Sequence, residues 1–222
     1  RGTELLAIGT TRDTLRSVED LMAQGGPAAV AVAFGPAQSG VTRWLRYRER
    51  GGTIDTRAFT HQVFDIPPVP LQGVRFFTID GRRYGYFMLR TFIETAIIPL
   101  RGRFSEYRQL GIRDIIIDLR YNGGGLVRIA ERMGDLMGRD RRASDVFSIT
   151  RFRTSKAAEN ETRQFQSDPD SIAPENLAFI TTGASASASE LIINSMLPWH
   201  PGAVTLVGAN TAGKPVGQIA ID

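Results

Sequence analysis

The sequence predicts an α/β protein, because segments with strand spacing and segments with helical spacing alternate along most of its length. Residues 115–117 are three isoleucines in a row, which is typical of a buried strand, and residues 127–137 follow with helical spacing. The same alternation continues further on, where we expect a strand at 177–181, a helix at 186–196 and a strand at 203–207.

A smaller module precedes these elements. Residues 66–70 (Ile-Pro-Pro-Val-Pro) separate it from them, and such a stiff, extended segment predicts a domain boundary. We therefore expect two domains, residues 1–66 and residues 67–222. Within the module we expect a strand at 4–8, a helix at 14–23 that Gly25-Gly26-Pro27 ends, and strands at 28–34 and 41–48.

The larger part is predicted to begin with a hairpin, since residues 76–79 and 84–89 flank the turn signal Asp80-Gly81-Arg82. A helix is expected at residues 100–110, before the isoleucine run. The segments between the later elements are polar, and we expect a loop at 138–142 and a lid-like stretch at 155–174.

Composition excludes several classes of function. The longest apolar stretches are strand-sized, so no membrane span is expected, and the arginines that give the net charge of +4 are spread over the chain, which favours a solvated surface over a nucleic-acid site. There is no cysteine, which removes thiol catalysis and thiolate metal sites. With only His61 and His200 besides, we expect no metal, no cofactor and no Ser–His–Asp triad.

Of the 27 Lys and Arg residues, only Lys156 and Lys214 are lysines. A lysine can give up its proton in a protein, whereas an arginine cannot. Burial can lower the pKa of a lysine to about 7–8, at which its amine is a useful base. An ordinary surface lysine is the alternative for each of the two.

Two glycine- and serine-rich motifs suggest a catalytic site. Residues 118–125 (Asp-Leu-Arg-Tyr-Asn-Gly-Gly-Gly) end the isoleucine strand, and their glycines let main-chain N–H groups approach a ligand or a developing negative charge. Residues 183–190 (Gly-Ala-Ser-Ala-Ser-Ala-Ser-Glu) join a strand to a helix, where small residues let a serine nucleophile sit at the helix N-terminus. A tight turn and a simple N-cap are the respective alternatives.

A third motif, residues 208–218, contains Lys214 and ends at Gln218, which can hold a neutral amine without adding a charge. Its first seven residues also fit the phosphate loop of nucleotidases, G-x-x-x-x-G-K. Pro215 stands where such a loop needs Ser or Thr for magnesium, and the acidic strand ending at Asp118 precedes the loop instead of following it. Both features disfavour a nucleotidase.

In their order and spacing, the three motifs resemble those of the C-terminal processing (tail-specific) peptidases of family S41. The resemblance covers about residue 67 to the end and implies a crotonase-like (ClpP/crotonase) α/β peptidase core, truncated at its C-terminus. Residues 1–66 resemble the later part of a PDZ domain. Two departures are a slightly longer interval between Ser187 and Lys214 and Pro215 in place of the commoner glycine.

The resemblance also implies roles for five residues. Ser187 is the nucleophile, Lys214 the general base and Gln218 the residue that positions the base. Gly125 and Ala188 match the positions whose N–H groups form the oxyanion hole. The chain is thus expected to be a serine endopeptidase that cleaves proteins or peptides near their C-termini through an acyl-enzyme.

Family members usually act outside the cytoplasm, so an extracytoplasmic location, the bacterial periplasm or cell envelope, is implied. The implied partners are protein or peptide substrates and no nucleic acid, and an oligomer stays open. A non-catalytic peptide- or ligand-binding member of the same fold is the alternative function. The intact Ser187, Lys214 and Gln218 argue against that alternative, because a binding protein does not need all three.

Overall fold

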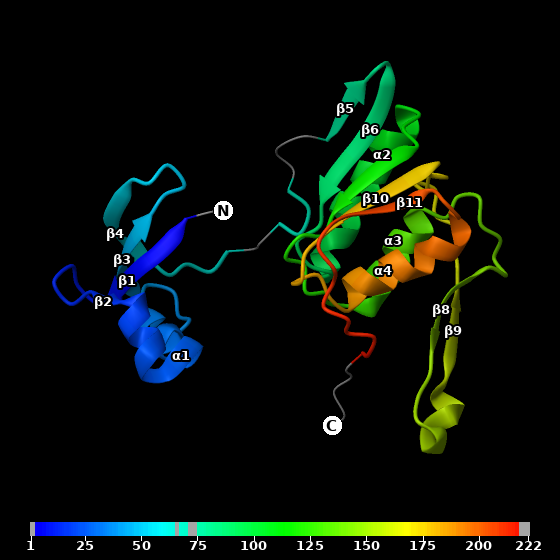
Figure 1. Cartoon of the computed structure of the whole chain (residues 1–222). Helices are drawn as coiled ribbons and strands as arrows, with labels where there is room; N and C mark the ends of the chain where they lie inside the picture. Colours follow the sequence, from blue (N-terminus) through cyan, green and yellow to red (C-terminus); the bar gives the residue numbers. More distant parts are fainter. Residues whose placement is uncertain (1–2, 65–66, 71–74, 218–222) are drawn as a thin grey trace. The chain divides into compact units, whose positions relative to one another are not determined.

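In the computed structural model, which describes residues 3–64, 67–70 and 75–217, the chain divides into two compact units. The first unit is Arg1–Ile66 and the second is Pro67–Asp222. Both appear in Figure 1, and each is described by itself.

The first unit is a four-stranded antiparallel sheet with one helix, α1 (Val18–Phe34). The order of its strands is β2-β1-β3-β4. Ile8 and Leu21, each 1% exposed, anchor the small core between sheet and helix. The strands are β1 (Glu4–Gly9), β2 (Arg16–Ser17), β3 (Thr42–Arg48) and β4 (Ile54–Thr60).

The predicted strand at residues 28–34 is wrong, because this segment is the second part of α1. The predicted break is real: Gly25 (φ −161°) and Gly26 (φ +62°) leave the helical conformation. Pro27 then suits the first turn of a new helical segment, where its missing N–H costs nothing. The alanine-rich sequence that follows favours helix, and this preference outweighs the valines that suggested a strand.

The second unit contains a five-stranded sheet in the order β11-β10-β7-β6-β5. Four neighbouring strands are parallel, and β5 joins the edge antiparallel through a hairpin. The hairpin turn is at Asp80 and Gly81, which both have positive φ, as a two-residue turn of this kind requires. The strands are β5 (Phe76–Ile79), β6 (Arg82–Met88), β7 (Asp114–Asp118), β10 (Asn176–Thr181) and β11 (Val204–Gly208).

Three helices contribute to the core that covers this sheet. Their buried side chains form one apolar cluster with alternate residues of the three central strands, so that along β6, β7 and β10 one face of the sheet is buried and the other mostly half-buried. Ile116, inside the isoleucine run, lies on the half-buried face. The prediction of an α/β fold is confirmed. The helices are α2 (Ile97–Gln109), α3 (Val127–Leu136) and α4 (Ala188–Met196), with short 3₁₀ turns at Glu94–Ala96 and Leu197–Trp199.

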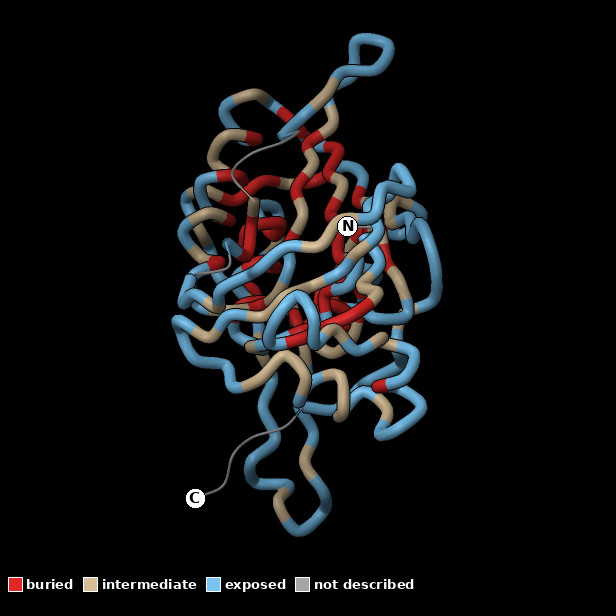
Figure 2. The backbone as a smooth tube through the Cα atoms, turned by 90° about the vertical axis from the view of Figure 1, so that its left-hand side faces the viewer, coloured by how far each residue is buried: buried red, intermediate tan, exposed pale blue. Residues whose placement is uncertain are grey.

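Between α3 and β10 the chain forms an arm, which we define as residues 146–164. It is an antiparallel hairpin of β8 (Val146–Thr150) and β9 (Glu161–Gln164), with a 3₁₀ turn at Thr154–Glu159 (Figure 1). Most of the arm is exposed, whereas the buried residues gather in the sheet and its helices (Figure 2). A polar, lid-like stretch was predicted from residue 155, and its first part is instead regular hairpin.

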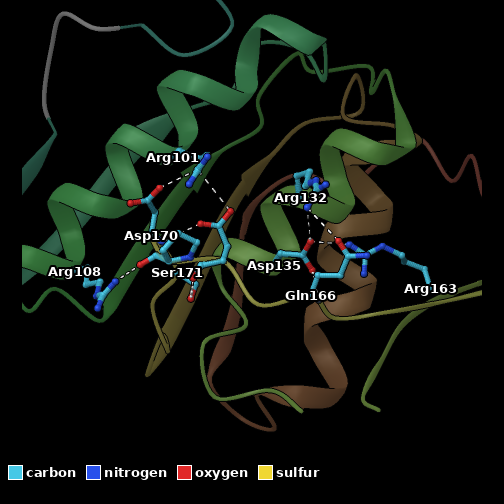
Figure 3. A network of polar contacts seen from close by, with 10 residues as sticks. Arg101, Arg108, Arg132, Asp135, Arg163, Gln166, Asp170 and Ser171 are labelled. Atoms are coloured by element: carbon cyan, nitrogen blue, oxygen red, sulfur yellow. Dashed lines mark hydrogen bonds and ion pairs between the residues drawn. The ribbon is translucent and has the colours of Figure 1, made fainter. Parts of the chain in front are cut away.

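The chain that returns from the arm is fastened to the core. Phe165 and Ile172 are buried in the apolar cluster, and Asp135 of α3 accepts hydrogen bonds from Arg163 (2.6 Å) and from the Gln166 N–H (2.8 Å). On the α2 side, Arg101 donates to Asp170 (2.9 Å), as Figure 3 shows. This part is therefore packed against the core and is not lid-like. Among the described residues, no helix is long and apolar enough to cross a membrane.

Candidate active site

Ser187 lies at the N-cap of α4, directly after the turn that leaves β10. Its backbone has φ +57° and ψ −116°. Ser187 is one of only three non-glycine residues with positive φ in the described chain. Such strain is kept only where the surroundings enforce it, and it turns the side chain away from the regular helix. Ser187 is also next to the unpaired N–H groups of a helix start, which favour negative charge.

The two serines that flank Ser187 have structural tasks. Ser185 is fully buried, and its hydroxyl donates to the Leu119 carbonyl (2.7 Å) at the end of β7. Ser189 is fully buried as well and donates to the Asn122 carbonyl (2.9 Å). Of the three serines in the motif, only the middle one is left for chemistry.

Asn122 organises the glycine loop, which we define as residues 122–126. Its buried side-chain amide donates to the Leu89 carbonyl and accepts from the Gly124 N–H, both at 2.9 Å. Its own carbonyl accepts from the Ala186 N–H (3.1 Å). The loop is therefore tied both to the chain after β6 and to the turn that carries Ser187.

Gly124 lies against that turn so closely that no larger residue fits. A Cβ at this position would lie 2.8 Å from Cβ of Ser187 and from the Ala186 carbonyl oxygen, and 2.9 Å from the Ala188 nitrogen. Its φ of +103° adds strain for any other residue. Glycine is thus required here by close approach of two backbones.

Two backbone donors beside Ser187 are unused. The N–H groups of Gly125 and Ala188 donate no hydrogen bond to any residue that the structure describes. Their neighbours are fixed, since Phe92 N–H donates to Gly124 (3.0 Å) and Leu126 N–H donates to Phe92 (2.7 Å). Rigid, unused donors next to a serine can hold the negative charge that develops on a carbonyl oxygen.

Glu190 joins the serine turn to the loop that carries Lys214. Its Oε2 accepts from the N–H of Ser187 (2.8 Å) and of Lys214 (2.9 Å), and its Oε1 accepts from Gly213 N–H (2.6 Å). Burial raises the pKa of Glu190, but hydrogen bonds from the Thr211 hydroxyl and from these three N–H groups outweigh it and hold the pKa below its ordinary value. The sequence motif contained Glu190, yet no role was predicted for it. The signal was available, because Glu three residues after an N-cap serine is the pattern of a capping box.

Lys214 is exposed, which contradicts the expectation of a buried lysine. Lys214 belongs to the lysine loop, which we define as residues 209–217. This loop follows β11 and contains no helix or strand. The described residues 208–217 contain no helix, whereas the lysine of a phosphate loop stands at the start of one. Only the backbone of Lys214 is brought to the serine turn. Gln218 lies outside the described residues.

The acidic residue of the first motif is a structural group. Asp118 is fully buried and pairs with Arg120 (2.7 Å), and it accepts from the Tyr86 hydroxyl (2.8 Å). Burial raises the pKa of Asp118, but the hydrogen bonds from Arg120 and Tyr86 outweigh burial and hold the pKa below its ordinary value. The carboxylate therefore stays ionised. In the described part of the chain, no three His, Asp or Glu residues come together to hold a metal.

Comparison with known proteins agrees with this geometry. A model of peptidase family S41 matches residues 83–222, which contain all three motifs. A structure from Bacteroides fragilis assigned to the S41 proteases is similar with a TM-score of 0.66 and 19% identity over 96% of this chain and 55% of that one. The photosystem II D1 C-terminal processing protease is similar with a TM-score of 0.54 and 20% identity over 96% of this chain and 52% of that one.

At such identities the two structures establish the fold. The chain spans about half the length of both. No curated protein sequence matches it.

Proposed function

We propose, from the premise that the chain belongs to peptidase family S41, that it is a serine endopeptidase with Ser187 as nucleophile and Lys214 as general base. One observation carries this proposal. A single buried carboxylate oxygen of Glu190 binds the backbone nitrogens of both residues, at 2.8 and 2.9 Å. Ser187 and Lys214 are 27 positions apart in the sequence. Because their backbone nitrogens share this oxygen, the two nitrogens cannot be further apart than the sum of the two bond distances.

The proposed reaction follows from the groups around Ser187. The Lys214 amine takes the hydroxyl proton as Oγ attacks the peptide carbonyl, and the N–H groups of Gly125 and Ala188 stabilise the resulting oxyanion. Collapse of this intermediate breaks the C–N bond, and the protonated amine returns its proton to the leaving nitrogen. Water then hydrolyses the acyl-enzyme by the same two steps.

The exposed side chain of Lys214 is compatible with this role, because the loop backbone is already in place. A lysine side chain has a flexible four-carbon stem, so rotation about its bonds is enough to bring the amine toward Ser187. We propose that Gln218 then orients the amine, as the family resemblance implies.

Finer features of the function are also proposals. The sheet-and-helix unit of residues 1–66 supports a partial PDZ domain, and we propose that it presents chain ends to the site. Cleavage near C-termini agrees with the name of the D1 processing protease, to which the fold is similar. We propose an extracytoplasmic location, the periplasm or cell envelope, on the family resemblance alone.

The test is cleavage of an unfolded, carboxymethylated protein by Ser187→Ala and Lys214→Ala. We expect a loss of rate of at least about 10³-fold in each, because removing either member of such a pair disables the other. Ser155→Ala and Lys156→Ala, both in the exposed arm, are matched controls that should cleave as the wild type does.

A correctly folded Ser187→Ala or Lys214→Ala variant with full turnover would contradict the assignment of that residue. If the wild type and Ser187→Ala are equally inert and both retain peptide in a binding assay, the non-catalytic alternative is correct instead.

A further inference from the structure

We propose that Glu190 is a positioning residue, which holds the lysine loop in register with the nucleophile. This inference rests on the proposed function and assigns a role that the peptidase motifs do not require. Glu190 itself is 9% exposed and lies within the first turn of α4, between the serine turn and the lysine loop.

The lysine loop depends on Glu190 for its attachment near Lys214. Ala212 N–H still donates to the Ser185 carbonyl (2.9 Å). From residue 213 to residue 217, the end of the described chain, the only hydrogen bonds are the two that Gly213 and Lys214 donate to Glu190. Removing this acceptor therefore frees the part of the loop that carries the base.

The partners of Glu190 require a carboxylate. All of them are donors: three backbone N–H groups and the Thr211 hydroxyl. A carboxylate accepts on both oxygens, whereas the amide of glutamine would turn an NH₂ donor toward at least one of these donors. N–H dipoles at the helix N-terminus balance the charge, so Glu190 needs no cation, and no ion pair with Lys214 is formed among the described residues.

The first test is Glu190→Gln, with Glu159→Gln in the arm as a control for the same change of charge. We expect kcat of Glu190→Gln to fall about 100-fold, as for a misplaced catalytic group, and KM to change less than about threefold. Hydrogen exchange should increase at residues 209–214 and stay unchanged at the helix, residues 188–196. Glu159→Gln should match the wild type in both measurements.

Two further variants keep the inference distinct from the proposed function. Ser187→Ala and Lys214→Ala in the same assay test the peptidase itself, and activity in either refutes the proposed function whatever Glu190 does. If both are inactive while Glu190→Gln is fully active, only the positioning role fails. Should Glu190→Gln not fold, Glu190→Asp, which keeps the charge and shortens its reach, is expected to lose kcat, and full kcat in it would overturn the role.

Discussion

The two halves of the candidate site are built differently. The fixed half, which consists of the glycine loop and the serine turn at residues 185–189, is held by hydrogen bonds from buried groups to the carbonyls of Leu89 and Leu119. The lysine loop is exposed, and around Lys214 it is attached only through Glu190 among the described residues. The residues proposed as nucleophile and oxyanion donors are thus held rigidly, while Lys214, the proposed base, is on a loop tethered through Glu190.

This difference separates two requirements of catalysis. Stabilising an oxyanion is most effective when the donors are already oriented, because no reorganisation is then needed as the charge develops. A base can approach when a substrate is present, and the part of the loop around Lys214, which is attached only through Glu190 among the described residues, can move in that way. The arrangement therefore suggests a site whose electrostatics are fixed by folding and whose proton transfer is adjustable.

The largest effect is expected from Gly124→Ala, which challenges the rigidity of the fixed half. The new Cβ would collide with the backbone of Ala186 and Ala188 and with Ser187. Moving nucleophile and donors apart should reduce kcat/KM by about 10³-fold. Steady-state cleavage, with circular dichroism to verify folding, measures this.

Gly123→Ala is the matched control, because its Cβ would meet nothing closer than the Ala184 carbonyl oxygen at 3.9 Å. Near-normal activity in this control is expected. If Gly124→Ala is equally active, the fixed half is not rigid and the contrast between the halves disappears.

A smaller effect is expected on stability from Asn122→Ala. The Leu89 carbonyl and the Gly124 N–H would each lose a buried partner, at about 1–3 kcal/mol for each unsatisfied group. We expect the free energy of unfolding, measured in urea, to be about 3 kcal/mol lower in Asn122→Ala than in the wild type. The control is Asn160→Ala, which removes an exposed hydrogen bond from the Phe152 N–H and should keep the free energy of unfolding within about 0.5 kcal/mol of the wild type. If both variants lost the same stability, the fixed half would be no more tightly held than the arm.

The smallest effect concerns the connection between the halves. His200, in the chain from α4 to β11, is 7% exposed, and its Nε2 has no hydrogen-bond partner in the described structure. Burial and the nearby Arg141 lower its pKa, while Asp140 opposes them. The unfolded chain therefore binds the proton at higher pH than the folded chain, so stability is lost as the pH falls below about 6.5.

His200→Gln, which does not titrate, should flatten this part of the stability curve. Urea unfolding of wild type and variant between pH 7 and pH 5 measures it. Parallel curves for the two proteins would mean that His200 is protonated as readily in the folded as in the unfolded state.

The sequence predicted the central sheet well, because its strands are strongly apolar and its turns carry clear glycine signals, as at Asp80-Gly81. It failed where local preference is ambiguous. Residues 28–34 alternate alanine with valine and suit strand or helix, and the Pro27 that ends one helical segment also begins the next. The arm was missed because its strands bury little apolar surface and because β9 (Glu-Thr-Arg-Gln) carries few strand-forming residues.

The candidate site was predicted as a set of motifs and not as a geometry. The resemblance of the motifs to those of family S41 pointed to Ser187, Lys214, Gly125 and Ala188, whose roles stay proposals. The exposure of Lys214 depends on what covers the lysine loop, which is a tertiary property. The capping-box pattern could have indicated the bond of Glu190 to Ser187, but its bonds to the backbone of Gly213 and Lys214 leave no trace in the side-chain identity of those residues.

The bonds that shape the serine turn join distant parts of the chain. Ser185 reaches back 66 residues to Leu119, directly after β7, and Ser189 reaches back 67 residues to Asn122 of the glycine loop. The Lys214 N–H reaches back 24 residues to Glu190. Contacts of such separation form late, after the cost of closing long loops has been met. During synthesis, which proceeds from the N-terminus, the serine turn therefore has to wait for β7 and β10 to pair, and the lysine loop is made after the serine turn. The proposed peptidase site would therefore be inert until the lysine loop has been made, which would protect the growing chain from it.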